Sequence, residues 1–129
     1  MTSTPSRVAV SLAFATACIV LVAGFEVASA HKVNAPSTVK ITSGGPDGAE
    51  GKVGTNRAAC KKGRKVRLYR VKSGKDDLIG WSFTNKEARW ELVTELDAGK
   101  YYAVVTRRRE GSGAHEHVCG RATSAKVKF

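Results

Sequence analysis

Residues 65–84 read KVRLYRVKSGKDDLIGWSFT, and this stretch decides the fold class. Across residues 65–72, apolar side chains alternate with cationic or aromatic ones, which is the period-two pattern of a strand with one buried face. The Ser-Gly-Lys-Asp segment that follows has the composition of a hairpin turn. Ile79, Trp81 and Phe83 then occupy alternate positions, so we expect a partner strand that directs these three side chains to one face. The stretch therefore predicts an antiparallel β-hairpin.

Outside this hairpin, short β-prone segments alternate with turns along the rest of the chain. Clusters of Gly, Asp, Asn and Ser separate the segments, and none of them has the periodicity of a helix. Roughly seven or eight short strands at this spacing predict an all-β fold, an antiparallel β-sandwich over residues 38–129 that follows a flexible lead-in at residues 31–37. Besides the hairpin, strands are expected at residues 38–42, 50–55, 89–96, 100–109, 118–122 and 124–129.

Three stretches show a likeness to a known architecture: residues 60–70 (CKKGRKVRLYR), residues 84–86 together with Trp90, and residues 96–104 (LDAGKYYAV). They resemble the seven-stranded, prealbumin-like sandwiches of carboxypeptidase regulatory-like and related bacterial Ig-like modules. The resemblance covers residues 50–129. It implies a spacer, a stalk or a docking surface, and no particular activity, because function belongs to sites rather than to folds.

The resemblance also implies details of packing. Tyr101 is expected to point inward, with Ala103 and Val105 on the same face. In such modules the turn before the aromatic strand often contains Gly, whereas this chain has Glu87-Ala88 there. The catalytic branch with this topology, the transthyretin-like hydroxyisourate hydrolases, ends in Tyr-Arg-Gly-Ser. This chain ends in AKVKF, which excludes that branch.

The first thirty residues have the pattern of a secretory signal peptide. Arg7 gives a positive start, residues 8–22 are almost entirely apolar, and Ala28-Ser29-Ala30 is a small-x-small cleavage site. Cleavage there predicts a secreted, extracellular protein that begins at His31 and keeps no membrane span. The apolar run also approaches the lower length limit for a span, so a retained anchor is the alternative interpretation.

Cysteine usage agrees with an extracellular location. Cleavage leaves Cys60 and Cys119 as the only thiols, and such a pair in an oxidising compartment predicts a disulfide. The bond would close a long loop, for which chain-entropy arguments give roughly 4 kcal/mol. That is comparable with the net stability of a small domain.

The formal net charge of +11 favours contact with an anionic polymer of the cell wall, a polysaccharide or a nucleic acid. Arg7 and Glu26 cancel, so cleavage leaves this charge unchanged. An alternative is that the cations only keep a small secreted protein soluble. The cations gather in two runs, and the candidates for polyanion contact are Lys61, Lys62, Arg64, Arg67, Arg107, Arg108 and Arg109.

Aromatic side chains interleaved with these cations raise the possibility of a stacking platform for bases or sugars. Trp81 and Trp90 alternate with aliphatic residues and are therefore expected in the core. Tyr69 and Tyr102 lie opposite the more apolar faces of their strands, so they are the better candidates for exposure. Two tyrosines alone do not define a ligand.

Three histidines suggest a second functional hypothesis. His115 and His117 would share one face of a strand, and His31 would become the amino-terminal residue, which can chelate copper through its amine and its ring. A copper-binding protein is therefore the alternative to a basic binding or structural module, with a solvated polar hairpin as the plain interpretation. Asp76 and Asp77 suit a turn. No residue pattern predicts catalysis or a cofactor.

Overall fold

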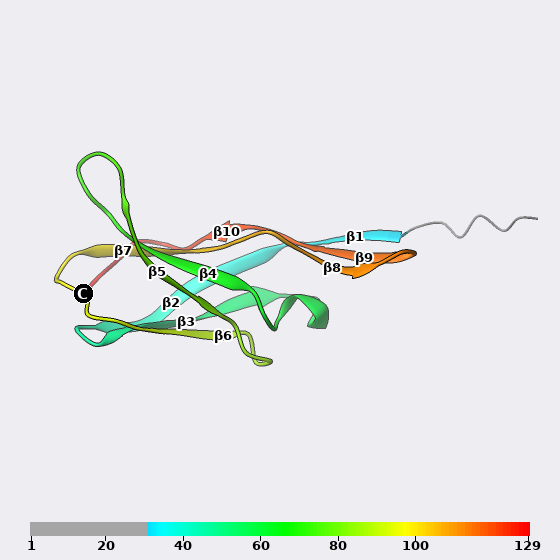
Figure 1. The fold of residues 1–129 in the computed structure, drawn as a ribbon, viewed down its shortest axis with the longest axis horizontal. Helices are drawn as coiled ribbons and strands as arrows, with labels where there is room; N and C mark the ends of the chain where they lie inside the picture. The colour runs from blue at the N-terminus through cyan, green and yellow to red at the C-terminus, as the bar shows by residue number, and fades with distance from the viewer. Residues whose placement is uncertain (1–30) are drawn as a thin grey trace, which may run out of the picture.

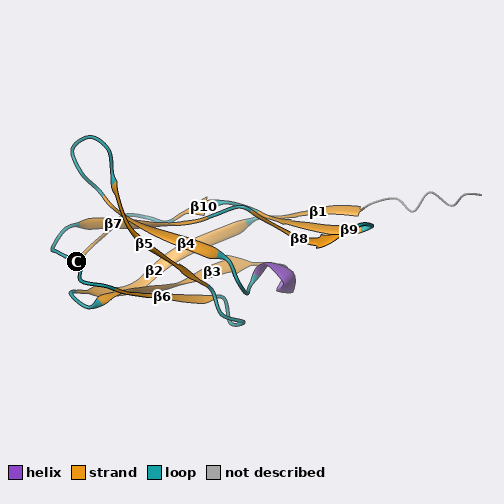
Figure 2. Cartoon of the chain, viewed as in Figure 1, coloured by secondary structure: helices purple, strands orange, loops and turns teal. Residues whose placement is uncertain are grey.

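Strands dominate residues 31–129, the part of the chain that the computed structural model describes (Figures 1 and 2). The expected signal peptide at residues 1–30 lies outside the described residues. Besides the strands there is one 3₁₀ turn, η1 (Ala58–Cys60). The strands are β1 (His31–Ala35), β2 (Ser37–Gly45), β3 (Gly48–Thr55), β4 (Lys65–Arg70), β5 (Asp77–Phe83), β6 (Arg89–Val93), β7 (Lys100–Val105), β8 (Arg108–Ser112), β9 (His115–Cys119), β10 (Ala122–Thr123) and β11 (Val127–Lys128).

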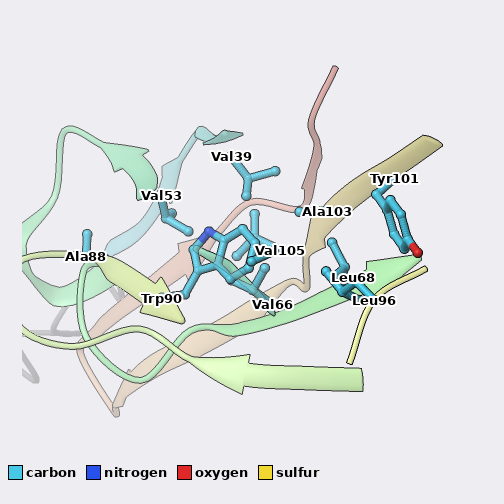
Figure 3. Packing of buried hydrophobic residues seen from close by; sticks show 11 residues of the cluster. Val39, Val53, Val66, Leu68, Ala88, Trp90, Leu96, Tyr101, Ala103 and Val105 are labelled. Carbon is cyan, nitrogen blue, oxygen red and sulfur yellow. The ribbon is translucent and has the colours of Figure 1, made fainter. Parts of the chain in front are cut away.

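Two antiparallel sheets pack face to face around one hydrophobic core. The first has the order β2-β3-β6 and the second β10-β7-β4-β5, with β11 also paired to β7. Figure 3 shows the side chains that meet between them. Val39, Val53 and Trp90 come from the first sheet, whereas Val66 and Val105 come from the second. The expectation of an all-β protein is confirmed.

The core also contains the aromatic strand that the family resemblance singled out. Tyr101, Ala103 and Val105 are all buried in it. The hydroxyl of Tyr101 donates a hydrogen bond to the carbonyl of Asp97, at 2.6 Å, so its polar end is satisfied while its ring packs inward. Phe129 stacks on the ring of Tyr101, which brings the end of the chain onto the core.

A third sheet, of order β1-β9-β8, forms an arm that extends from one end of the other two (Figure 1). β1 pairs in parallel with β9, from His31 opposite His115 to Ala35 opposite Cys119. The expectation of a flexible lead-in at residues 31–37 is therefore wrong. β9 supplies hydrogen-bond partners for this segment, and the local sequence does not reveal them. The parallel pair also departs from an entirely antiparallel fold.

The strand count is higher than expected because β1 is an additional strand and two predicted strands are divided. The segment at residues 100–109 splits into β7 and β8, which belong to different sheets. The break comprises Thr106 and Arg107, and the main-chain N–H of Thr106 makes the last bond to β4, at the carbonyl of Lys65. The segment at residues 118–122 spans the end of β9 and the start of β10, whereas the segment at residues 124–129 contains only β11.

The predicted hairpin at residues 65–84 is present, but its second strand faces the opposite way. Leu68 pairs with Gly80 and Tyr69 with Leu78, so Ile79 is an extra residue in β5. This bulge reverses the alternation. Ile79 packs against the core, whereas Trp81 and Phe83 lie outside with 49% and 56% of their surface exposed. The expectation that Trp81 is a core residue is wrong.

The turn between β5 and β6 has a non-glycine residue at a position that glycine usually occupies. Ala88 adopts a left-handed backbone conformation with φ of 62°, which is uncommon for a residue with a Cβ atom. The side-chain oxygen of Asn85 accepts hydrogen bonds from the main-chain N–H groups of Glu87 and Arg89, each at 3.0 Å. Asn85 therefore holds the turn in which Ala88 is strained.

The predicted disulfide between Cys60 and Cys119 is formed, with the two Cα atoms 5.5 Å apart. It connects η1 to the end of β9, and both cysteines are fully buried beside Ala35. The bond therefore fastens the arm to the two packed sheets. Within residues 31–129 there is no helix long and apolar enough to cross a bilayer.

Candidate functional site

The sheet β10-β7-β4-β5 presents one face to the core and the other to solvent. Val66 and Leu68 of β4 point into the core, so the residues between them point outward. Strand register then aligns the neighbours on the same side: Trp81, Arg67, Val104 and Thr123 form one row across four strands. We call this surface the outer face and define it by Lys65, Arg67, Tyr69, Trp81, Phe83, Tyr102 and Val104, of which Val104 is covered by its neighbours and buried.

Aromatic rings on the outer face are ordered by their contacts with one another. Tyr69 and Tyr102 are paired across strands and stack with ring centroids 5.3 Å apart and planes at 12°. Trp81 and Phe83 meet edge to face at 5.4 Å. The ammonium group of Lys65 lies 4.4 Å from the centre of the Trp81 ring, which places a positive charge directly on the aromatic surface.

A hollow of about 570 Å³ adjoins the two stacked tyrosines. Its lining includes the cations Lys75, Arg121 and Lys126, contributed by the β4–β5 hairpin and by the segments on either side of β10. Asp76 is the one carboxylate among the described residues that line it. The hollow is therefore an aromatic surface with an excess of positive charge around it.

Asp76 is tied into this hollow by two hydrogen bonds. Its carboxylate accepts one from the main-chain N–H of Lys72 at 3.0 Å and one from the hydroxyl of Tyr102 at 2.9 Å. These bonds, the first of them most, lower the pKa of Asp76. Desolvation, followed by the bond to Asp76, raises the pKa of Tyr102. At neutral pH the carboxylate is thus charged and the phenol neutral.

A neighbouring hollow of about 420 Å³ continues the cationic surface toward the arm. Arg121 lines both hollows, and Arg107 lines the second one together with Pro36 and Val118. Of the arginine run at residues 107–109, only Arg107 is exposed without a side-chain hydrogen bond or ion pair within residues 31–129.

The other two arginines of that run are engaged in the arm. Arg108 donates hydrogen bonds to the carbonyls of Lys62 and Gly63, at 2.8 and 2.6 Å, and forms an ion pair of 2.5 Å with Glu110. Arg109 forms an ion pair of 3.4 Å with Glu116. Both lie on β8, so they do not share a sheet with Arg67. Lys61 and Lys62 are exposed in the turn after η1.

Arg64 is not on the surface at all, although the sequence placed it among the polyanion-binding candidates. Its side chain is 0% exposed. The guanidinium donates to the carbonyls of Cys60, Thr106 and Gly120 and to the hydroxyl of Ser37, at 2.6–3.3 Å. Burial, and secondarily Arg108, lower its pKa, yet a guanidinium remains protonated. Arg64 is therefore a structural cation and is no longer a candidate for contact with a polyanion.

Sequence reasoning missed several residues of this surface. Trp81 was expected in the core, with Phe83 on the same face of its strand, because the bulge in β5 has no local sequence pattern. Arg121 and Lys126 are isolated cations near the end of the chain, and only the pairing of β10 and β11 with β7 brings them beside Tyr102. By contrast, Tyr69 and Tyr102 lie on the outer face, opposite the apolar faces of their strands as expected, although both are half-buried.

The three histidines of the copper hypothesis meet in the arm. His31 pairs with His115, and Val33 pairs with His117. The main-chain nitrogen of His31 donates a hydrogen bond of 2.8 Å to the carbonyl of Ala114. His117 is half-buried, and its Nδ1 has no hydrogen-bond partner. Across residues 31–129, no group of three or more His, Cys, Asp or Glu side chains is placed to hold a metal ion.

The chain matches no protein-family model, and no curated protein is significantly similar to it.

Proposed function

We propose that the chain is a secreted binding module of the Ig-like or prealbumin-like type, and that its outer face holds an anionic polymer. The observation that supports this most is the row structure of the outer face, where Arg67 lies between Trp81 and Val104 and the stacked tyrosines adjoin three further cations. Cations alternating with aromatic rings are the combination that binds flexible polyanions: charge follows the backbone and rings stack on planar groups.

The polymer we propose is a phosphodiester chain. Arg67 and Arg121 carry planar guanidinium forks, which match the oxygens of a phosphate group. The spread of cations from Lys126 past Arg121 to Arg107 suits a ligand with repeated charges better than a single anion. A cell-wall teichoic acid and a single-stranded nucleic acid share this backbone chemistry, and only the nucleic acid carries bases.

Salt dependence of binding tests the proposal. Affinity for an oligothymidylate and for poly(glycerol phosphate) should fall log-linearly with salt concentration, because each contacted phosphate releases condensed counterions. The double variant Arg67→Gln/Arg121→Gln should bind both polymers at least about tenfold more weakly, which corresponds to about 1.4 kcal/mol. Arg89→Gln is the matched control, because Arg89 is an exposed arginine on β6 of the opposite sheet.

A further substitution distinguishes the two polymers. Trp81→Ala should weaken oligothymidylate binding, since stacking on a base contributes about 1–3 kcal/mol, and should leave poly(glycerol phosphate) nearly unaffected. Absence of binding at low salt, or equal losses in the Arg89 control, would overturn the proposal. Tighter binding to heparin than to both phosphodiesters at matched charge would replace the phosphodiester by an acidic polysaccharide.

A further inference from the structure

The tip of the arm brings the start of the described chain beside a histidine from a distant segment. β1 and β9 run in parallel, so His31 and His115 are direct partners and their side chains project from the same side of the sheet. The main-chain nitrogen of His31 lies 2.8 Å from the carbonyl oxygen of Ala114, the residue immediately before His115. Both histidines are exposed.

Cleavage after Ala30 would turn that main-chain nitrogen into a primary α-amine. An amino-terminal histidine then offers two nitrogen donors, its amine and its imidazole, and the imidazole of His115 is placed to supply a third. Among the divalent first-row metals, Cu²⁺ binds nitrogen donors most tightly and accepts a planar arrangement of them. A metal-bound amine keeps its hydrogens, so the bond to the carbonyl of Ala114 can persist.

We propose that the mature chain binds a single Cu²⁺ through the α-amine and imidazole of His31 and the imidazole of His115. The site rests on cleavage before His31 and is independent of polymer binding by the outer face. It uses two side chains and one main-chain nitrogen. Because one of the three donors is a main-chain nitrogen, the site does not need a group of three or more His, Cys, Asp or Glu side chains, and no such group occurs in residues 31–129.

His117 is excluded from the ligand set by its position. It lies two pairs further along the ladder, opposite Val33 and next to Glu110 of β8, which is itself ion-paired to Arg108. Its side chain is half-buried, whereas His115 is exposed at the end of the arm. His115 can therefore turn toward a bound metal without disturbing the packing of the arm.

The test uses secreted protein whose first residue has been identified, loaded with Cu²⁺ alone in a buffer that does not bind metals. We expect equimolar binding and an electron paramagnetic resonance spectrum with coupling to three nitrogen donors. His115→Ala and addition of one alanine before His31 should each weaken binding by about tenfold or more, since even residues that only orient a ligand change metal affinity by about that factor. His117→Gln is the matched control and should bind copper like the unaltered protein.

Three results would overturn the proposal. The first is a mature amino terminus at a residue other than His31. The second is copper binding that the added alanine abolishes but His115→Ala leaves intact, because the metal would then be held by the amino terminus alone. The third is a larger loss in His117→Gln than in His115→Ala. Circular dichroism of each variant verifies that the strands are retained, and the polymer affinity of the same samples tests the outer face separately.

Discussion

Arg64 is a buried cation held by main-chain carbonyl groups rather than by a carboxylate. Its hydrogen bonds reach Cys60 in η1, Thr106 just after β7 and Gly120 just after β9, so one side chain joins three segments. We predict that Arg64→Met lowers the free energy of unfolding by about 3 kcal/mol or more, because several buried acceptors lose their donors together. Arg64→Lys should rescue little of this, since an ammonium group lacks the guanidinium fork.

Urea unfolding measures these changes, and Arg107→Gln serves as the exposed control, expected to stay within about 0.5 kcal/mol of the unaltered protein. Equal effects of the two substitutions would contradict the structural role of Arg64.

Asp76 makes the stability of the folded protein depend on pH. The hydrogen bonds from Lys72 and Tyr102 lower its pKa in the folded state below the unfolded value of about 3.9. Its contribution to stability is therefore present above that value and lost as the pH falls through the folded pKa. Asp76→Asn should be less stable than the unaltered protein at pH 7, and the two should converge in acid. Thermal unfolding between neutral pH and about pH 2 measures this, and a difference that does not change with pH would contradict it.

At the scale of strands, the bulge in β5 separates the two tryptophans. Trp90 is 2% exposed and belongs to the core, whereas Trp81 lies on the outer face. Trp90→Ala should cost about 3–5 kcal/mol of stability, the usual range for an aromatic removed from a core. Trp81→Thr should cost less than about 1 kcal/mol, because an exposed position with a β-branched replacement loses little packing. Denaturant unfolding measures the stability of both variants. A comparable loss of stability in both would indicate that Trp81 is a core residue.

Local sequence patterns predicted the positions of the strands better than they predicted which face of each strand is buried and which strands pair. Alternation in residues 65–72 and the following turn correctly predicted the β4–β5 hairpin, because those features depend on neighbouring residues. The bulge at Ile79 and the parallel pairing of β1 with β9 depend on contacts between distant segments, which no local pattern records. For the same reason the outward orientation of Tyr69 and Tyr102 was predictable, whereas the burial of Arg64 and the proximity of Arg121 to Tyr102 were not.

At the scale of the whole molecule, the disulfide joins the arm to the two packed sheets. The serine variant Cys60→Ser/Cys119→Ser should lose about 2–5 kcal/mol of stability, as small secreted domains usually do without a native disulfide. The bond lies at the end of β9, where the arm joins the two packed sheets. In the serine variant, the amide hydrogens of β1, β8 and β9 should therefore lose their protection from exchange first. Hydrogen exchange followed residue by residue measures this, and uniform loss across all three sheets would contradict a linking role.

A nuclear magnetic resonance titration can locate the proposed binding of an anionic polymer on one face of one sheet. A short oligothymidylate or poly(glycerol phosphate) is added to the labelled protein at low salt, and the main-chain amide shifts are followed by residue. We expect the largest shifts at Lys65, Arg67, Tyr102 and Arg121, and we expect them to disappear at high salt. Shifts centred on β2, β3 and β6, or no shifts at low salt, would contradict it.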